Sequence, residues 1–302
     1  MSQIGVSSVA FRSPEEARVF YEKEGIPLEY GVNLSPIDVD YLMVNKVKCI
    51  SLHIPSPTRG FFPNFATGDR KVYKESMDIL NESMETLSKC GGGTLVLHPG
   101  YAEDALLPSD YKNRKPFIER GINEFKDYII DKDGAVTGLS YLKSLSYKRH
   151  WKLLMENIGL VSEFVEDQGF YLAIENLNPR LYYLLQLPDE MVTLARISEN
   201  IYFCLDFGHL FISSLVNGFD FERGINKILS TGRVIHFHLS NNPSRIGYYN
   251  DAHNSILKGN IDYSKLLPKI REVQANFIVE IKSDPREDIA FLKKGLKREI
   301  SM

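Results

Sequence analysis

The stretch Tyr171-Leu-Ala-Ile-Glu175 is a short apolar run that ends in a carboxylate. Similar runs, rich in β-branched and aromatic residues, recur along the whole chain. Near-continuous apolar runs of this length are typical of parallel strands that are covered on both faces. The sequence therefore predicts strands at residues 3–9, 28–32, 47–53, 93–98, 170–176, 201–206, 233–239 and 276–281.

Helical periodicity fills the gaps between these runs. Ser13-Pro14-Glu15-Glu16 is a helix start, with Pro at the first helical position and acids in the first turn. Residues 70–89 repeat apolar side chains at helical spacing and are followed by Gly91-Gly92-Gly93, which ends the helix. Further helices are expected at 36–44, 150–167, 188–198, 221–230, 263–273 and 286–297.

This alternation predicts an α/β protein, a single closed (β/α)₈ TIM barrel over residues 1–302. A doubly wound open sheet is the alternative, but no Gly-x-Gly-x-x-Gly turn follows the first strand. One connection, residues 101–149 after the fourth strand, is far longer than the others. Connections of that length are functional or disordered. Its many aromatic residues indicate an ordered insertion over one mouth of the barrel.

The composition is that of an ordinary globular protein, 43% hydrophobic and 25% charged. The 36 Lys and Arg against 39 Asp and Glu give a net charge of −3, which disfavours a strongly basic nucleic-acid-coating protein. No apolar run approaches the ~20 residues that span a bilayer, and no signal-peptide pattern is visible. Cys49, Cys90 and Cys204 are widely spaced, which favours buried thiols in a reducing compartment over disulfides. We therefore expect a cytoplasmic protein.

Histidine and acidic residues gather where the expected strands end. In a (β/α)₈ barrel, functional side chains lie at the C-terminal ends of the strands. Five of the 7 histidines fall at such an end or in the loop after one. The candidate residues are His53, His98, Glu175, Asp206, His209, His238, Asp251, His253 and Glu280.

Because the strand ends converge, these imidazoles and carboxylates would share one pocket. Burying them without partners would be costly, whereas zinc, manganese and iron accept both as ligands. Nine ligands exceed the need of one ion, so a site for two or three ions is expected. Of the other histidines, His150 opens a helix in a basic stretch and is expected to be solvated or to cap it. His236 lies two residues before His238, so we expect it deeper in the barrel, beside the ligands.

From His53 to Glu280 the pattern resembles the xylose-isomerase-like barrel superfamily. Within it, the pattern resembles the endonuclease IV family (AP endonuclease family 2), apurinic/apyrimidinic endonucleases of DNA repair. The pieces that carry the resemblance are His98-Pro-Gly, Asp206-x-x-His209, His238-Leu-x-Asn241, and Asp251-x-His253 followed by Gly259-Asn260-Ile261.

The resemblance implies a site for three zinc ions. The first ion would be held by His53, His98 and Glu175, the second by Glu175, Asp206, His238 and Glu280, and the third by His209, Asp251 and His253. A hydroxide that bridges the first two ions would attack the phosphodiester. Glu175 is then the expected catalytic residue, as a bridging ligand and orienting group rather than a free base.

The chain departs from the family pattern around the ligands. Asn241 stands where the family has Asp, Asn176-Leu-Asn-Pro-Arg180 replaces a Gly-containing loop, and Ile54-Pro-Ser-Pro follows His53 where an aromatic residue is common. The insertion is outside the usual set of DNA-binding loops. Basic residues that would contact phosphates near the mouth are Arg59, Arg180, Arg245, Lys258 and Lys282.

Three functions are open at this point. The first is a metal-dependent phosphodiester hydrolase, most simply one that cleaves DNA at abasic sites. The second is a sugar isomerase or epimerase, with one divalent ion on Glu175, Asp206, His238 and Glu280 and the two glutamates as acid and base. The third, a non-catalytic metal-bearing barrel, has no positive support. The extra histidines favour hydrolysis, whereas an aromatic lid suits a small phosphoester or sugar.

Overall fold

The computed structural model describes residues 2–297. Eight strands of this part of the chain close into a barrel in the order β1-β12-β11-β10-β9-β5-β3-β2, and neighbouring strands are parallel. The expected (β/α)₈ barrel is therefore confirmed. The strands are β1 (Gln3–Ser7), β2 (Leu28–Tyr30), β3 (Cys49–His53), β5 (Thr94–Leu97), β9 (Tyr171–Glu175), β10 (Tyr202–Asp206), β11 (Val234–Leu239) and β12 (Asn276–Val279).

The interior of the barrel explains why the strand ends carry polar groups. Ala173 and Cys204 are fully buried, and each lies two residues before an acidic strand end. Because alternate residues of a strand share a face, Glu175 and Asp206 point into the barrel and not toward the helices. The register places Asp206 beside His238 of the next strand. Strand periodicity and barrel closure together bring these groups to one mouth.

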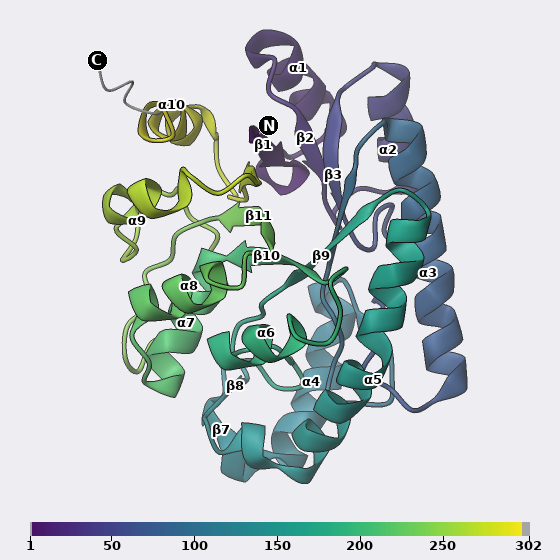
Figure 1. The fold of residues 1–302 in the computed structure, drawn as a ribbon, viewed down its shortest axis with the longest axis vertical. Coiled ribbons are helices and arrows are strands. Elements are labelled where there is room, and N and C mark those ends of the chain that lie inside the picture. Colours follow the sequence, from purple (N-terminus) through teal and green to yellow (C-terminus); the bar gives the residue numbers. More distant parts are fainter. Residues whose placement is uncertain (1, 298–302) are drawn as a thin grey trace.

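Helices cover the outside of the barrel, with α3 and α5 on one flank and α7, α8 and α9 on the other (Figure 1). All eight expected helices are present, and their starts follow the sequence signals. The Ser13 hydroxyl accepts the amide of Glu16 at 3.2 Å, and Ser35 forms a capping box with Asp38. The helices are α1 (Pro14–Glu24), α2 (Pro36–Val44), α3 (Arg70–Cys90), α5 (Leu145–Asp167), α6 (Pro188–Leu194), α8 (Phe221–Leu229), α9 (Tyr263–Ile270) and α10 (Arg286–Gly295).

Strict alternation of one strand with one helix is wrong after β10, where α7 (Phe207–Asn217) precedes α8. This helix begins at the strand end because the Asp206 Oδ1 accepts the amide of His209 at 2.6 Å. Its sequence is apolar nearly all round, so it lacks the polar face that makes a helical period recognisable. Asp206 thereby fixes the place of His209, one turn further on.

The long connection after β5 is ordered and lies at the lower end of the molecule in Figure 1. Rings of Phe125, Tyr128 and Tyr141 pack with centroids 5.7 to 6.3 Å apart, and the three residues join the main hydrophobic core. The following helix starts at Leu145, a turn earlier than expected. The short elements here and nearby are η1 (Ser8–Ala10), β4 (Phe61–Phe62), β6 (Leu107–Pro108), α4 (Tyr111–Glu124), η2 (Lys126–Tyr128), β7 (Ile129–Asp131), β8 (Val136–Thr137) and η3 (Tyr141–Lys143).

A buried amide, Asn64, fastens the first residues of this insertion to the barrel. Its Nδ2 donates to the carbonyls of Glu103 at 2.6 Å and Ala105 at 3.0 Å, and its Oδ1 accepts the amide of Tyr101 at 2.9 Å. Gly100 packs directly against it, since a Cβ there would lie 2.7 Å from the Asn64 Oδ1. Asn64 and Gly100 thus form a close-packed junction, which we call the Asn64 clasp.

Two further expectations concern membranes and thiols. Among residues 2–297, no helix is both long enough and apolar enough to cross a bilayer. Cys49 and Cys204 are buried free thiols, as expected. The expectation of burial is wrong for Cys90, which is partly exposed at the end of α3 because the helix terminates there.

Candidate metal centre

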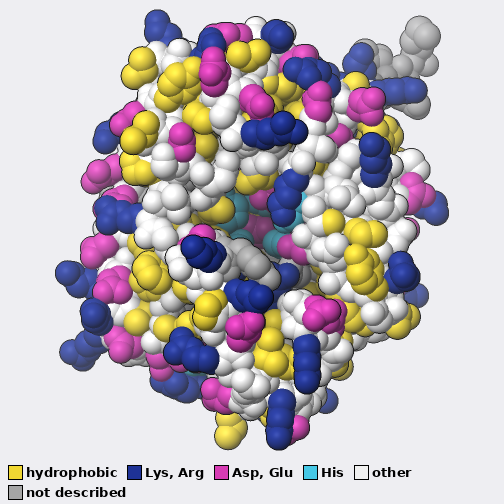
Figure 2. Space-filling view, turned by 180° about the vertical axis from the view of Figure 1, so that it is seen from behind, with side chains coloured by type: hydrophobic (Ala, Val, Ile, Leu, Met, Phe, Trp, Pro, Cys, Tyr) yellow, Lys and Arg dark blue, Asp and Glu magenta, His cyan; other side chains and the backbone are white. Residues whose placement is uncertain are grey.

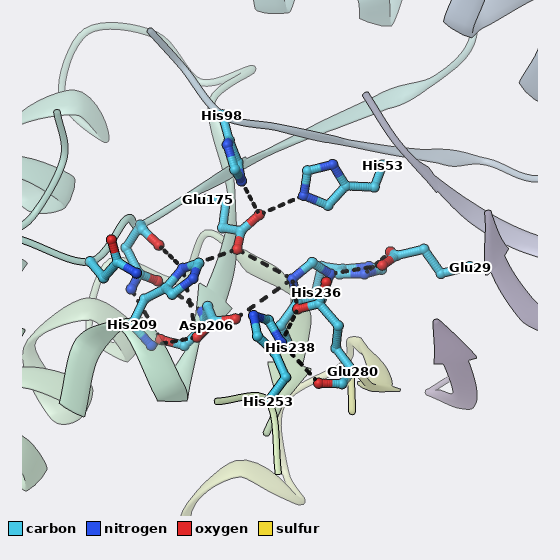
Figure 3. A network of polar contacts seen from close by, with 12 residues as sticks. Glu29, His53, His98, Glu175, Asp206, His209, His236, His238, His253 and Glu280 are labelled. Carbon is cyan, nitrogen blue, oxygen red and sulfur yellow. Dashed lines mark hydrogen bonds and ion pairs between the residues drawn. The ribbon is translucent and has the colours of Figure 1, made fainter. Parts of the chain in front are cut away.

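The nine candidate ligands come together at the C-terminal mouth of the barrel, around Glu175. All of them except Asp251 are labelled in Figure 3. Seven of them are buried, and Asp251 and His253 are half-buried. Their donor atoms form three groups within which all donors lie within 4.8 Å of one another. The groups are His53, His98 and Glu175; Glu175, Asp206, His238 and Glu280; and His209, Asp251 and His253. Glu175 belongs to two of the groups.

Glu175 turns one oxygen toward each of its two groups. Its Oε2 lies 3.0 Å from the Nε2 of His53 and 3.4 Å from the Nε2 of His98, and its Oε1 lies 3.4 Å from the Nδ1 of His238. Two ligand atoms each ~2.1 Å from one tetrahedral zinc ion are ~3.4 Å apart. The observed separations of 3.0 to 3.4 Å, which are also those of hydrogen bonds, are compatible with donors that share an ion.

The third group repeats this spacing. Asp251 Oδ2 lies 3.3 Å from the Nε2 of His209, and its Oδ1 lies 3.4 Å from the Nε2 of His253. In the second group the Nδ1 of His238 is 3.3 Å from a Glu280 oxygen. The Oδ2 of Asp206, 3.8 Å from the same Nδ1, is buried and has no hydrogen-bond partner among residues 2–297. A bare buried carboxylate oxygen is costly, and a cation would satisfy it. The donor set of this chain therefore fits divalent cations.

Four of the histidines are held from outside in the way that metal ligands are. The Nδ1 atoms of His53, His209 and His253 lie 3.0 to 3.1 Å from the carbonyls of Ile54, Asn176 and Glu280. A carbonyl only accepts, so each Nδ1 carries a proton and each Nε2 is the ring nitrogen turned toward the cluster, where it would bind a cation in the neutral form of the ring. His98 Nδ1 similarly contacts the Tyr101 hydroxyl at 3.1 Å, which leaves its Nε2 toward Glu175.

The fifth histidine, His238, is held by a carboxylate that sequence analysis missed. Glu29 on β2 is fully buried, and its Oε1 lies 3.0 Å from the Nε2 of His238. Its Oε2 lies 2.9 Å from the Nε2 of His236 and accepts the Ser51 hydroxyl at 2.8 Å. His238 therefore turns its Nδ1 to the cluster, with Glu29 behind it (Figure 3). The sequence signal that could have identified Glu29 is an acidic residue between two apolar ones in the short strand β2, one position before the strand ends.

Neighbouring charges set the pKa values of the cluster. Burial raises the pKa of the Asp206 carboxyl to about 6 and lowers the pKa of His98 to about 4. For His253 burial acts downward, but the carboxylates of Asp251, Glu280 and Asp206 together outweigh it and the pKa rises to about 9. For Asp251 burial acts upward, but His253 and His209 outweigh it and the pKa falls well below its usual range. At neutral pH this pair is thus ionised, and a bound cation would displace the proton.

The loop that carries Asp251 and His253 is held in a strained, well-anchored form. His253 has φ of +48°, a left-handed conformation that costs a non-glycine residue energy and recurs at functional sites. Asn241, where the family pattern has Asp, donates to the carbonyls of Ile256 at 3.0 Å and Ile261 at 2.9 Å. Asn241 therefore ties the two ends of the loop together instead of facing the cluster.

The two remaining histidines have structural positions. The expectation that His150 is solvated or caps a helix is wrong, because α5 begins five residues earlier and His150 is buried within it. Its Nδ1 lies 2.6 Å from the Ala66 carbonyl. His236 lies below His238 in the barrel interior, as expected, and its Nε2 is held by Glu29. Cys204 and the two histidines also come close enough to hold an ion, but Glu29 already contacts both Nε2 atoms.

A cavity of about 430 Å³ lies above the cluster, within the range of small-molecule sites. Figure 2 shows histidine and acidic side chains at the bottom of this hollow and Lys and Arg side chains around it. Phe62 and Tyr183 give it aromatic walls. Apart from the candidate ligands, its charged lining residues within 2–297 are Arg114, Arg180 and Lys282, and we call these three the rim cations.

Most of the chain matches one known protein family. The family of xylose isomerase-like TIM barrels matches residues 41–297. The chain belongs to this family. An uncharacterized protein of Methanocaldococcus jannaschii is 22% identical over 99% of this chain and 90% of its own. A probable endonuclease 4 of Mycobacterium ulcerans is 21% identical over 83% of this chain and 81% of its own.

Several solved structures resemble this one over nearly the whole chain. A D-tagatose 3-epimerase-like protein superimposes with a TM-score of 0.68 at 20% identity and covers 97% of each chain. A Thermus thermophilus protein whose crystals were soaked with ZnCl₂ has a TM-score of 0.60 at 17% identity and also covers 97% of each chain. At such identities the likeness shows the fold alone. Of the proteins named above, one is a probable endonuclease and one is an epimerase-like protein.

Only some of the basic residues expected to contact phosphate lie at the mouth of this barrel. Arg180 and Lys282 line the cavity. Arg59 instead pairs with Glu82, Arg245 lies over the ring of Tyr248 at 5.2 Å, and Lys258 is exposed in the loop before α9. Sequence analysis also missed Arg114, which reaches the cavity from the insertion. No local signal in α4 distinguishes it from the other basic residues of that helix.

Proposed function

We propose that this xylose isomerase-like barrel is a phosphoester hydrolase that works with three divalent cations. The observation that carries the proposal is the size of the donor set. A group of four, Glu175, Asp206, His238 and Glu280, would suffice for one ion. Five more ionisable donors stand beside it at ligand spacing. Their burial without cations would be costly, and sites with several ions are suited to phosphoester hydrolysis.

The chain's own residues would hold and align the reacting groups. Divalent cations bound here would neutralise phosphate oxygens and lower the pKa of a water molecule. Glu175 would set the spacing between two of the ligand groups, since each of its oxygens faces one of them. Asn178 donates to the Oδ2 of Asp251 at 3.0 Å and would keep that carboxylate oriented. In this proposal water is the nucleophile, because the candidate ligands include no hydroxyl or thiol.

Sugar epimerisation is the second candidate function. It is favoured by the small cavity and by the complete four-residue group at its floor. The structural neighbours named as epimerases point the same way. In that reaction Glu175 and Glu280 would move a proton next to a carbonyl, and His53, His98, Asp251 and His253 would not be required.

The deciding experiment combines metal analysis with three classes of substrate. We expect about three ions per chain and turnover of nitrophenyl phosphodiesters or an abasic-site duplex, but not of ketoses. His253→Gln should abolish hydrolysis, whereas it would spare an epimerase. Lys258→Gln, an exposed change in the same loop, is the matched control. One ion per chain together with ketose epimerisation would overturn the proposal in favour of the second candidate.

A further inference from the structure

We propose that the cavity takes small phosphoesters that carry a second anionic group, bound by the rim cations Arg114, Arg180 and Lys282. This inference rests on the proposed hydrolase function and names its substrate class. The phosphoester would react at the ligand cluster. A phosphate or carboxylate at the other end of the same molecule would bind at the rim.

The charges along the cavity wall are the first support. The acidic residues that line it, Glu175, Asp251 and Glu280, all belong to the ligand groups. Within residues 2–297, none of the rim cations forms an ion pair with an acidic side chain. Three divalent ions would also exceed the charge of the four carboxylate ligands. The occupied cavity is therefore positive from floor to rim, and an anionic ligand would balance it.

Arg114 is held ready for such a ligand. Its Nη1 donates to the Ser109 carbonyl at 3.3 Å, and its Cζ lies 5.9 Å from the centre of the Phe62 ring. The Phe62 ring in turn stacks on His98, with centroids 4.8 Å apart and planes 21° apart. The Arg114 Nε is buried without a hydrogen-bond partner among the described residues. The side chain is thus already ordered, which lowers the entropic cost of binding an anion. Its Nε is a donor that is still unused.

The other two rim cations stand on the same loops as the floor. Lys282 lies two residues after Glu280, and its amide donates to the His253 carbonyl at 2.9 Å. The Arg180 amide donates to the Asn178 carbonyl at 2.7 Å. Asn178 lines the cavity, is only 4% exposed, and its Oδ1 has no hydrogen-bond partner in the described chain. A hydroxyl between the two anionic groups of the substrate would satisfy this oxygen.

The size of the cavity limits the size of the substrate. A volume of about 430 Å³ suits a molecule of sugar-phosphate or nucleotide size. The insertion contributes Ser109 and Arg114 to its lining, so the mouth is narrowed on that side. A duplex would have to bind across this insertion, whereas a small ester fits beneath it.

The test uses the metal-loaded full chain and three nitrophenyl phosphodiesters of equal length. Their second ester arm ends in a hydroxyl, a carboxylate or a phosphate, and kcat/KM is measured for each. We expect at least about a tenfold preference for both anionic ends over the hydroxyl end, as for charge-assisted hydrogen bonds. Arg114→Gln should remove most of this preference through a higher KM, and added salt should weaken it. Lys112→Gln, exposed on the same helix, should leave it unchanged.

Each other outcome has a definite meaning. Equal kcat/KM for the three esters, or an unchanged preference in Arg114→Gln, overturns this inference and leaves the hydrolase function standing. An abasic-site duplex cleaved far faster than every small ester does the same. Absence of turnover with all esters and with the duplex overturns the proposed function and this inference together. A preference for one anionic end alone, lost in Arg114→Gln, also supports the inference and identifies whether phosphate or carboxylate binds.

Discussion

The floor and the rim of the cavity are built by different means. The floor is made of strand ends, so its ligands follow from a two-residue period and from closure of the barrel. The rim depends on contacts between distant segments, such as Arg114 over Phe62 and Phe62 on His98. The barrel therefore fixes where ions would bind, while the inserted segment shapes what reaches them. Substitutions at the floor and at the rim should accordingly have different effects.

Glu175→Gln should have the largest effect, because it removes the carboxylate that two ligand groups share. Hydrolysis should fall by more than about a hundredfold, since even outer contacts to ligands are worth ~10–100-fold. The metal content should drop as well. Measurements of kcat/KM and of ions per chain test this, with Glu163→Gln on the exposed face of α5 as the control. A variant with full activity would show that Glu175 is not a shared ligand.

Glu29→Gln should have the next largest effect and should act on metal affinity. A glutamine carries no charge and has one acceptor oxygen, which the hydrogen bonds of His236 and Ser51 would occupy, so His238 would lose the ion-pair contact that turns its Nδ1 to the cluster. We expect affinity for one ion to fall ~10–100-fold with the fold retained. Chelator competition measures the affinity, and histidine NMR of the metal-free protein reports the protonation of the two His238 ring nitrogens. Ser51→Ala, which removes one hydrogen bond to Glu29, should be milder. Unchanged affinity together with unchanged protonation of His238 would reject the positioning role.

The pH dependence of stability and of metal binding should come from the ligand groups at the floor of the cavity. The pKa of His253 is raised to about 9, so its contribution to stability is complete below its ordinary pKa and is lost as the pH rises through about 9. The lowered pKa of Asp251 acts oppositely, and its contribution is lost only as the pH falls into the acid range. Since an ion displaces the His253 proton, the Tm gain on adding metal should widen between about pH 6 and pH 8.5. A gain independent of pH would contradict this.

Arg245→Ala and Arg59→Ala should have the smallest effects. Both side chains lie outside the cavity lining, one over Tyr248 and one beside Glu82. Exposed substitutions of this kind usually change stability by less than ~0.5 kcal/mol. Thermal unfolding and kcat/KM for a small ester should therefore match the unchanged protein. A loss confined to cleavage of an abasic-site duplex, with a shallower salt dependence, would instead show that a nucleic acid crosses this face.

What the sequence could predict follows the same division. The eight strands and the nine grouped donors were predictable, because each donor sits at or near an apolar run that ends. Helix α7 was not, since its apolar sequence hides the helical period. His150 was misplaced because its helix begins at Leu145 and buries it. Glu29 and Arg114 were missed because their roles depend on contacts with residues more than 20 positions away, His236 and Phe62, and no local sequence pattern shows such contacts.

The Asn64 clasp has a consequence for engineering. Both polar atoms of the buried Asn64 amide bond to the first residues of the insertion. The close packing at Gly100 leaves no space for a side chain beside Asn64. A transplanted segment between about residues 106 and 140 would therefore inherit a rigid attachment as long as both residues were kept. Substrate preference could then be exchanged between related barrels as a cassette, while the ion-binding end stayed untouched.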